Sequence, residues 1–244
     1  MKTIITPPRS KYATSIKSLV KCLSFLRWLY KSYNSFLNKD LFSLRAKVEN
    51  LGFGSYRKMI IGSCNKIIIG KNTRMSNTLF HIIGHNNTIH IGANCTIGTG
   101  CSFWMEGDNI EVVIGDGCTF TRRVHLNAQE HSRKILIGKD CMFSNHITVR
   151  TSDSHPIYSM YDNERINPAR DVIIGSHVWI APDTKVMKGA NIGSGCIIGS
   201  NTMVNKEIPC NSLAVGMPAK IVKTKVRWTR EDIIFKKKLI INEN

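Results

Sequence analysis

An aliphatic side chain returns at every sixth position in the second half of the chain. From residue 174 onward these anchors are Ile174, Ile180, Val186, Ile192, Ile198 and Val204, each six residues from the next. An amphipathic helix needs an apolar spacing near 3.6, and a single strand a spacing of about 2. A spacing of six instead predicts a short strand plus a turn, repeated, so that stacked units bury a core that no single unit could bury.

A longer repeat precedes this region. Ile-Gly pairs begin at residues 69, 91, 114 and 137, which are 22, 23 and 23 residues apart. Within the later segments, apolar anchors again step by six, as in Ile114, Phe120 and Leu126. Each coil is therefore expected to have three six-residue sides and one longer corner. The prediction is an all-β core of about six coils, running from about Ile61 to Pro209.

The repeat breaks step between Val149 and Ile174, which are 25 residues apart. The anchor after Val149 would fall on His155, and 25 is not a multiple of six. Pro156 and Pro168 disfavour regular strand pairing in this stretch. Long loops inside compact repeats usually carry function. Residues 151–171 are therefore expected to form a functional loop, the alternative being a solvated loop with a surface histidine.

The six-residue steps, the loop sequence SDSHPI and the following NPARDVIIGSHVWI resemble the hexapeptide-repeat acetyltransferases. Within that family they are similar to the sugar and polysaccharide O-acetyltransferases, including those of sialic-acid polymers. The resemblance covers about residues 60–225 and implies a left-handed parallel β-helix, a handedness that spacing alone does not give. It also implies a homotrimer that transfers acetyl from acetyl-CoA to a hydroxyl of a bacterial surface polysaccharide or its precursor.

The resemblance makes His155 the general base. Histidine titrates near neutrality and can accept the proton of a sugar hydroxyl as that oxygen attacks the thioester. Asp153 is expected either to orient the imidazole or to cap its own loop backbone. Trp179 is expected to form an apolar wall beside the acyl chain, the alternative being a packing role at a subunit seam.

The stretch SLAVGMPAKIVK, residues 212–223, resembles the close of the β-helix in these enzymes, where CoA runs in a groove between subunits. Ala181 and Gly199 are small enough for the pantetheine arm to approach the backbone. The CoA phosphates are expected to meet three lysines, each of which could otherwise be an ordinary surface charge: Lys206, Lys220 and Lys223. Arg122 and Arg123 are candidates for contact with a carboxylate-bearing sugar, or are simply exposed.

The net charge of +17 is concentrated at the N-terminus, where residues 1–60 hold 12 Lys/Arg against two acids. Apolar residues such as Ile16, Leu19, Leu23 and Leu26 follow helical spacing there. We therefore expect a basic helical arm over residues 1–59, the β-helix over 60–225 and a tail over 226–244. The amphipathic part, residues 11–50, is expected to lie on an anionic membrane surface or to pack on protein.

Other functions remain open at this stage. The same base and groove would serve N-acetylation of an amino-sugar nucleotide. A metal enzyme could use His85 and His90, although no metal is expected because CxxC pairs are absent and the histidines do not repeat in register. A non-catalytic scaffold would not need the loop. Nucleic acid is not expected, because the positive charge lacks an aromatic stacking platform. Reduced cysteines and the lack of an apolar leader favour a cytoplasmic protein.

Overall fold

The computed structural model describes residues 46–231, so most of the predicted helical arm lies outside the described residues. Residues 46–50 of that arm form strand β1 (Ala46–Asn50), residues 53–59 belong to strand β2 (Phe53–Ile61), and the helical prediction is wrong for both segments. β1 pairs in parallel with β3, and β2 pairs in parallel with β4. The stack of strands therefore begins at residue 46 rather than at the expected boundary near 60.

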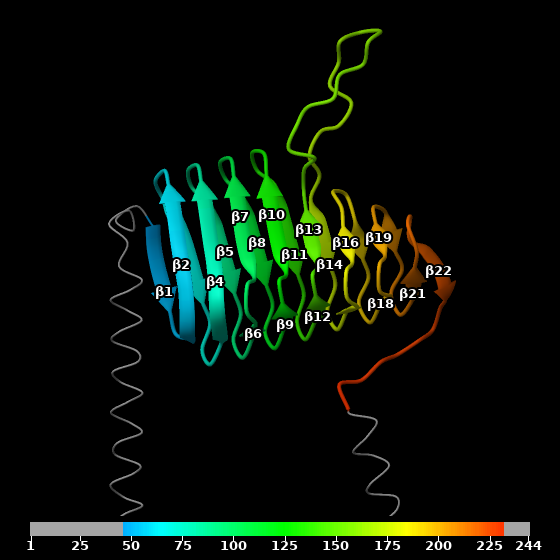
Figure 1. Ribbon diagram of the computed structural model, residues 1–244, viewed down its shortest axis with the longest axis horizontal. Helices are drawn as coiled ribbons and strands as arrows, with labels where there is room; N and C mark the ends of the chain where they lie inside the picture. The colour runs from blue at the N-terminus through cyan, green and yellow to red at the C-terminus, as the bar shows by residue number, and fades with distance from the viewer. Residues whose placement is uncertain (1–45, 232–244) are drawn as a thin grey trace, which may run out of the picture. The chain divides into compact units, whose positions relative to one another are not determined.

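The described residues form a parallel β-solenoid with three sides (Figure 1). The first side is an eight-stranded sheet of β1, β3 (Asn65–Ile69), β5 (Thr88–Ile91), β8 (Glu111–Ile114), β11 (Lys134–Ile137), β14 (Val172–Ile174), β17 (Asn191–Ile192) and β20 (Glu207–Ile208). The second side holds β6 (Thr96–Ile97), β9 (Thr119–Arg122), β12 (Met142–Asn145), β15 (Trp179–Ile180), β18 (Ile197–Ile198) and β21 (Leu213–Val215). The third side holds β7 (Ser102–Glu106), β10 (His125–Gln129), β13 (Thr148–Arg150), β16 (Lys185–Val186) and β19 (Met203–Val204).

The two ends of the stack differ from its middle. At the N-terminal end, β2 (Phe53–Ile61) and β4 (Arg74–Ile83) are long strands, and β4 pairs with both β6 and β7, so it spans two sides. At the C-terminal end, β22 (Lys220–Lys223) turns back antiparallel to β21. Five coils with three separate strands each remain between these ends, from β5 to β19, slightly fewer than the six predicted. The implied left-handedness stays a prediction.

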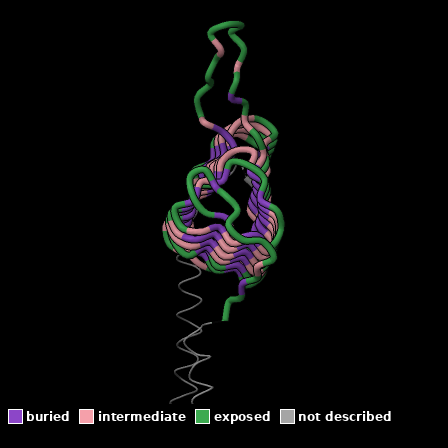
Figure 2. The backbone as a smooth tube through the Cα atoms, turned by 90° about the vertical axis from the view of Figure 1, so that its right-hand side faces the viewer, coloured by how far each residue is buried: buried purple, intermediate pink, exposed green. Residues whose placement is uncertain are grey.

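The six-residue anchors are buried and form the core of the solenoid, whose walls alternate between buried and more exposed residues along the chain (Figure 2). Phe80 stacks on Phe103 with ring centroids 5.0 Å apart, and Phe120 lies 4.5 Å from Phe143 in the same way. Five cysteines, each four residues after an isoleucine that opens a six-residue unit, are buried and free: Cys95, Cys101, Cys118, Cys141 and Cys196. Like residues thus stack on like residues along the coil axis, which is how parallel repeats bury a continuous core.

The recurring Ile-Gly pair marks a corner where successive coils approach closely. A Cβ atom placed on Gly115 would lie 2.7 Å from the backbone carbonyl carbon of Gly138, and one on Gly138 would lie 2.6 Å from the backbone nitrogen of Ser176. Real Cβ atoms do not approach backbone so closely, so this corner requires glycine because the next coil already occupies the space.

Residues 151–171, named here the His155 loop, leave the solenoid between β13 and β14, as the broken repeat predicted (Figure 1). The loop folds as a hairpin: the Ile166 amide donates to the Ile157 carbonyl at 2.9 Å, and the Ser159 amide to the Glu164 carbonyl at 2.9 Å. Several apolar side chains of the hairpin are exposed, including Met160 and Tyr161. Within residues 46–231 we find no helix of the length and apolarity that crossing a membrane requires.

Candidate active site

The base of the His155 loop is fixed to the solenoid by an ion pair. Arg165 donates two hydrogen bonds to the Glu130 carboxylate, at 2.8 and 2.7 Å, and the buried Ser152 hydroxyl donates a third at 2.7 Å. The Arg165 guanidinium is the main reason that the pKa of Glu130 falls from its ordinary 4.5 to about 2. A carboxylate that stays ionised at neutral pH therefore holds the loop against the end of β10.

Asp153 also anchors the loop. Its carboxylate accepts hydrogen bonds from Lys188 at 2.5 Å and from the Asn167 amide at 3.0 Å. The hydrogen bond from Lys188 is the largest cause that lowers the pKa of Asp153. The same Asn167 amide donates to the backbone carbonyl of His155 at 2.9 Å. Asp153 thus holds the backbone beside the histidine, and no contact with the imidazole supports the orienting role expected for it.

His155 is exposed on the stem of the loop. Its imidazole makes no hydrogen bond with any residue in the part of the chain that the structure describes, whereas its backbone is held through Asn167. The preceding Ser154 has a φ of +70° and hydrogen-bonds Gln129 and Arg150. The loop therefore fixes the position of the backbone while the side chain stays exposed, which suits a group that must exchange a proton with a bound substrate.

Trp179 lies at a different corner from His155. It opens β15, where it pairs with Met142 on one side and Ile197 on the other. The His155 loop leaves between the third and first sides, whereas Trp179 follows the corner between the first and second sides. The topology of one chain therefore does not bring the two predicted catalytic residues together.

A segment of the C-terminal tail packs beside Trp179. Trp228 is 7% exposed, its ring stacks on His177 with centroids 4.1 Å apart, and it lies 6.1 Å from the Trp179 ring. The ring nitrogens of His177 face the Asp140 carboxylate at 2.7 Å and the Trp228 carbonyl at 3.2 Å. Arg230 extends the contact by donating to Asp140 at 2.8 Å. The first part of the predicted tail thus packs on the solenoid surface as far as Arg230.

The residues expected to bind CoA lie on the coils that follow the loop. Ala181 and Gly199 occupy equivalent places after β15 and β18, where the Ala181 amide donates to the Ile198 carbonyl at 2.9 Å. Lys220 and Lys223 are exposed on β22, and Lys206 is exposed between β19 and β20. Ala181 and Gly199 therefore form one column of small residues, while Lys206 belongs to another corner.

Sequence reasoning named Asp153 but missed its partner Lys188 and the Glu130–Arg165 pair that also anchors the loop. Glu130 and Arg165 are 35 residues apart, and Asp153 and Lys188 are also 35 apart, so neither pair follows the six-residue repeat. Only one sequence feature could have indicated that Trp228 packs on the solenoid: it is a large aromatic residue in an otherwise polar stretch of the tail. In residues 46–231, no group of three or more histidine, cysteine, aspartate or glutamate side chains is placed to hold a metal ion.

Known proteins are similar to this chain in sequence and in fold. The family described as bacterial transferase hexapeptide (six repeats) matches residues 171–206. The polysialic acid O-acetyltransferase of Escherichia coli O1:K1 is 37% identical over 86 residues, which are 35% of this chain and only 28% of that relative's length. The polysialic acid O-acetyltransferase of Neisseria meningitidis is 35% identical over 180 residues, 70% of this chain and 79% of the relative.

Two crystal structures extend the comparison. The polysialic acid O-acetyltransferase OatWY superposes with a TM-score of 0.71 and 31% identity, covering 82% of this chain and 94% of that one. The polySia-specific acetyltransferase NeuO does so with a TM-score of 0.51 and 28% identity, covering 78% and 84%. The likeness therefore runs through the solenoid and beyond the matched repeats, and the chain belongs to the hexapeptide-repeat acetyltransferase family that includes the polysialic acid O-acetyltransferases.

Proposed function

We propose that this protein is an O-acetyltransferase that moves the acetyl group of acetyl-CoA onto a hydroxyl of a bacterial surface polysaccharide or its precursor. The observation that carries the proposal is His155, exposed on a loop whose stem is held by two carboxylates, in a chain related over most of its length to polysialic acid O-acetyltransferases.

In the proposed reaction, His155 acts as general base. Its imidazole accepts the proton of the acceptor hydroxyl while that oxygen attacks the thioester carbonyl. The tetrahedral species collapses, the C–S bond breaks, and the CoA thiolate takes up the proton from the imidazolium. The products are an acetyl ester and free CoA.

Three features of the chain fit acetyl-CoA as the donor. Ala181 and Gly199 form a column of small residues along which a pantetheine arm can approach the backbone. Lys220 and Lys223, exposed on the final strand, are positioned at the end of the stack where they can meet phosphates as point charges. Trp179 would supply an apolar wall for the acetyl group.

We further propose that the protein works as a homotrimer. Because His155 and Trp179 lie at different corners of one chain, a site that uses both needs a neighbouring chain. A cyclic trimer places one corner of each chain against a different corner of the next and repeats that contact three times. Each site would then combine the His155 loop of one chain with Trp179 of its neighbour.

The test is an acceptor screen with purified protein and acetyl-CoA, read by thiol release and product mass. The panel contains a polysialic acid oligomer, a neutral glucan and an amino-sugar nucleotide. We expect acetylation of the polysaccharide that mild base removes, as an ester requires, and a loss of about 10²–10⁴-fold in turnover for His155→Ala. His85→Ala, exposed at the equivalent corner of an earlier coil, is the matched control. Base-stable acetylation confined to the amino sugar would overturn the proposal.

A further inference from the structure

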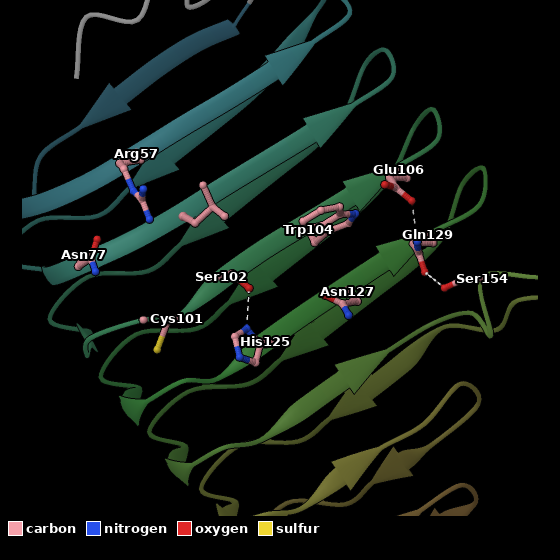
Figure 3. A pocket seen from close by; sticks show the side chains of 12 residues that line it. Arg57, Asn77, Cys101, Ser102, Trp104, Glu106, His125, Asn127, Gln129 and Ser154 are labelled. Atoms are coloured by element: carbon pink, nitrogen blue, oxygen red, sulfur yellow. Dashed lines mark hydrogen bonds between the residues drawn. The ribbon is translucent and has the colours of Figure 1, made fainter. Parts of the chain in front are cut away.

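The two predicted catalytic residues have different surroundings in the structure. The stem of the His155 loop borders an open groove on the third side, lined by residues that include Trp104 and Ser154 (Figure 3). Trp179, on the second side, packs instead beside the C-terminal tail. Residues 224–231 leave β22 and run back along the solenoid toward earlier coils, drawn in red in Figure 1.

A five-residue segment of this tail, residues 226–230 and named here the tail strap, crosses the corner between the first and second sides. The Val226 amide donates to the Asn211 carbonyl of the last coil at 3.0 Å. Two coils earlier along the stack, the Trp228 indole N–H donates to the His177 carbonyl at 2.9 Å. The strap therefore runs back over the coils at the corner that leads into β15.

Arg230 ends the strap as an anchor. Its Nε donates to the Asp140 carboxylate at 2.8 Å, and one terminal nitrogen donates to the Thr119 hydroxyl at 2.9 Å. The other terminal nitrogen donates to the Cys141 carbonyl at 3.0 Å. Because the guanidinium presents its donors in a rigid fork, engaging all three nitrogens fixes it in one orientation. The anchor thus fixes the end of the strap and holds Trp228 against the corner.

Trp228 supports the ring of Trp179. It is itself 7% exposed and lies flat on His177, with ring centroids 4.1 Å apart and an angle of 7° between the rings. Its centroid lies 6.1 Å from that of Trp179, within the range that favourable aromatic pairs occupy. Trp228 lies at the corner before the second side, whereas Ala181 and Gly199 lie at the corner after it. The strap and the column of small residues therefore flank Trp179 from opposite corners.

Trp179 has little other support for its ring. Its strand β15 has two residues, and its neighbours in the sheet are Met142 and Ile197, which are half-buried as Trp179 is. A half-exposed side chain keeps access to more than one staggered rotamer unless packing selects one. Trp228 is buried and hydrogen-bonded, so its ring provides a fixed surface that selects the rotamer of Trp179.

We propose that the tail strap positions Trp179 and thereby makes the enzyme selective for acetyl over longer acyl groups. The inference rests on the proposed function, in which Trp179 forms the apolar wall beside the acetyl group. A wall that is held from behind does not retreat from an additional methylene, and one methylene in an apolar pocket discriminates by about 10–200-fold. Trp228 is therefore a positioning residue that acts through Trp179, and Arg230 holds it in place.

The first test compares acetyl-CoA with propionyl-CoA as donors, using the acceptor that the wild type acetylates in the screen above. We expect the wild type to prefer acetyl-CoA in kcat/KM, and Trp228→Ala to lower that preference at least about fivefold. Trp228→Phe, which keeps an aromatic ring, should restore most of it. Arg230→Met leaves Trp228 in the chain but releases the end of the strap, so it should act in the same direction and replaces Trp228→Ala if that variant does not fold.

Phe103→Ala is the control for a general loss of stability. It removes a fully buried core ring on the third side and leaves the strap intact. It should therefore keep the donor preference of the wild type at a temperature where it stays folded. A loss of preference in this control as large as in Trp228→Ala would overturn the inference.

Fluorine NMR of the full chain labelled with 5-fluorotryptophan reads the ring of Trp179 without any reaction, its signal being identified by its absence in Trp179→Phe. We expect one sharp signal in the wild type and a broadened or doubled signal in Trp228→Ala. A single sharp signal in that variant, or an unchanged donor preference in both strap variants, would overturn the strap while acetyl transfer by the wild type persisted. A wild type that shows the expected signals but transfers no acetyl would overturn the proposed function instead.

Discussion

The carboxylate of Glu130 is the loop anchor whose contribution can be worked out from the structure. It accepts two hydrogen bonds from Arg165 and one from Ser152. The fall of its pKa from 4.5 to about 2 sets an upper bound of about 3.4 kcal/mol on the preference of the folded site for the ionised form. Because the Glu130 side chain is 31% exposed, solvent screening reduces that figure to about 1–2 kcal/mol.

Glu130→Gln should therefore increase the population with an opened loop stem by about 5–30-fold. Hydrogen exchange of the full chain at pH 7 reads this opening directly, because local opening sets the exchange rate of bonded amides. The reporters are the Ile157 amide, bonded to Asn167 at 2.7 Å, and the Ile166 amide, bonded to Ile157 at 2.9 Å. Both should exchange faster in the variant, while the amides of β14 keep their protection.

The control is Lys134→Met, which removes an exposed ion pair to Glu111 of 3.0 Å on the first side of the solenoid. It should leave exchange in the His155 loop unchanged. If Glu130→Gln and the wild type exchange the two loop amides at the same rate, the ion pair does not hold the loop and the reasoning from the pKa of Glu130 is refuted.

Three further predictions concern pH, the tail and the core. Because the pKa of Glu130 is lowered, the stability that its carboxylate gives to the loop stem is complete above pH 4.5 and is lost as the pH falls through about 2. The difference in amide exchange between Glu130→Gln and the wild type should therefore vanish as the pH falls through about 2. A difference that persists below that pH would contradict this prediction. Trp228→Ala should destabilise the fold by about 3 kcal/mol and shift the fluorescence emission of the neighbouring Trp179. An unchanged Tm would place Trp228 outside the packed structure. Phe120→Ala, which removes a fully buried ring from the core ladder, should cost about 3–5 kcal/mol in denaturant unfolding, and a loss below 1 kcal/mol would argue against a stacked core.

The solenoid could be predicted because its determinants repeat in the sequence. The coils place the same residue types at the same positions, so that the repeat of Ile114, Ile137 and Ile174 predicts from sequence alone the core in which they are buried. The break before Ile174 also predicted the His155 loop. The N-terminal end of the stack could not be predicted in this way, because Ile60 is the one buried residue of β2 and the others are exposed or half-buried, so the strand has no run of buried anchors.

The contacts that position the candidate site follow no repeat. Asp153 pairs with Lys188 only because the loop folds back onto the next coil, and Arg165 reaches Glu130 for the same reason. Trp228 meets His177 across 51 residues of chain. Such pairs depend on the path of the loop and the tail in space, which spacing does not encode. The sequence therefore identified the loop, its histidine and Asp153, but not Lys188, Glu130 or Arg165, which hold the loop in place.

The central claim is that His155 of one chain and Trp179 of its neighbour complete one acetyl-transfer site. Subunit mixing tests it most directly: His155→Ala and Trp179→Ala chains carrying different tags are co-expressed, and only oligomers that contain both are purified. Each mixed trimer would hold one interface with an intact histidine and an intact tryptophan, so activity should return to about one third of the wild-type value. Mixed oligomers that form but stay as inactive as their parents would contradict the claim.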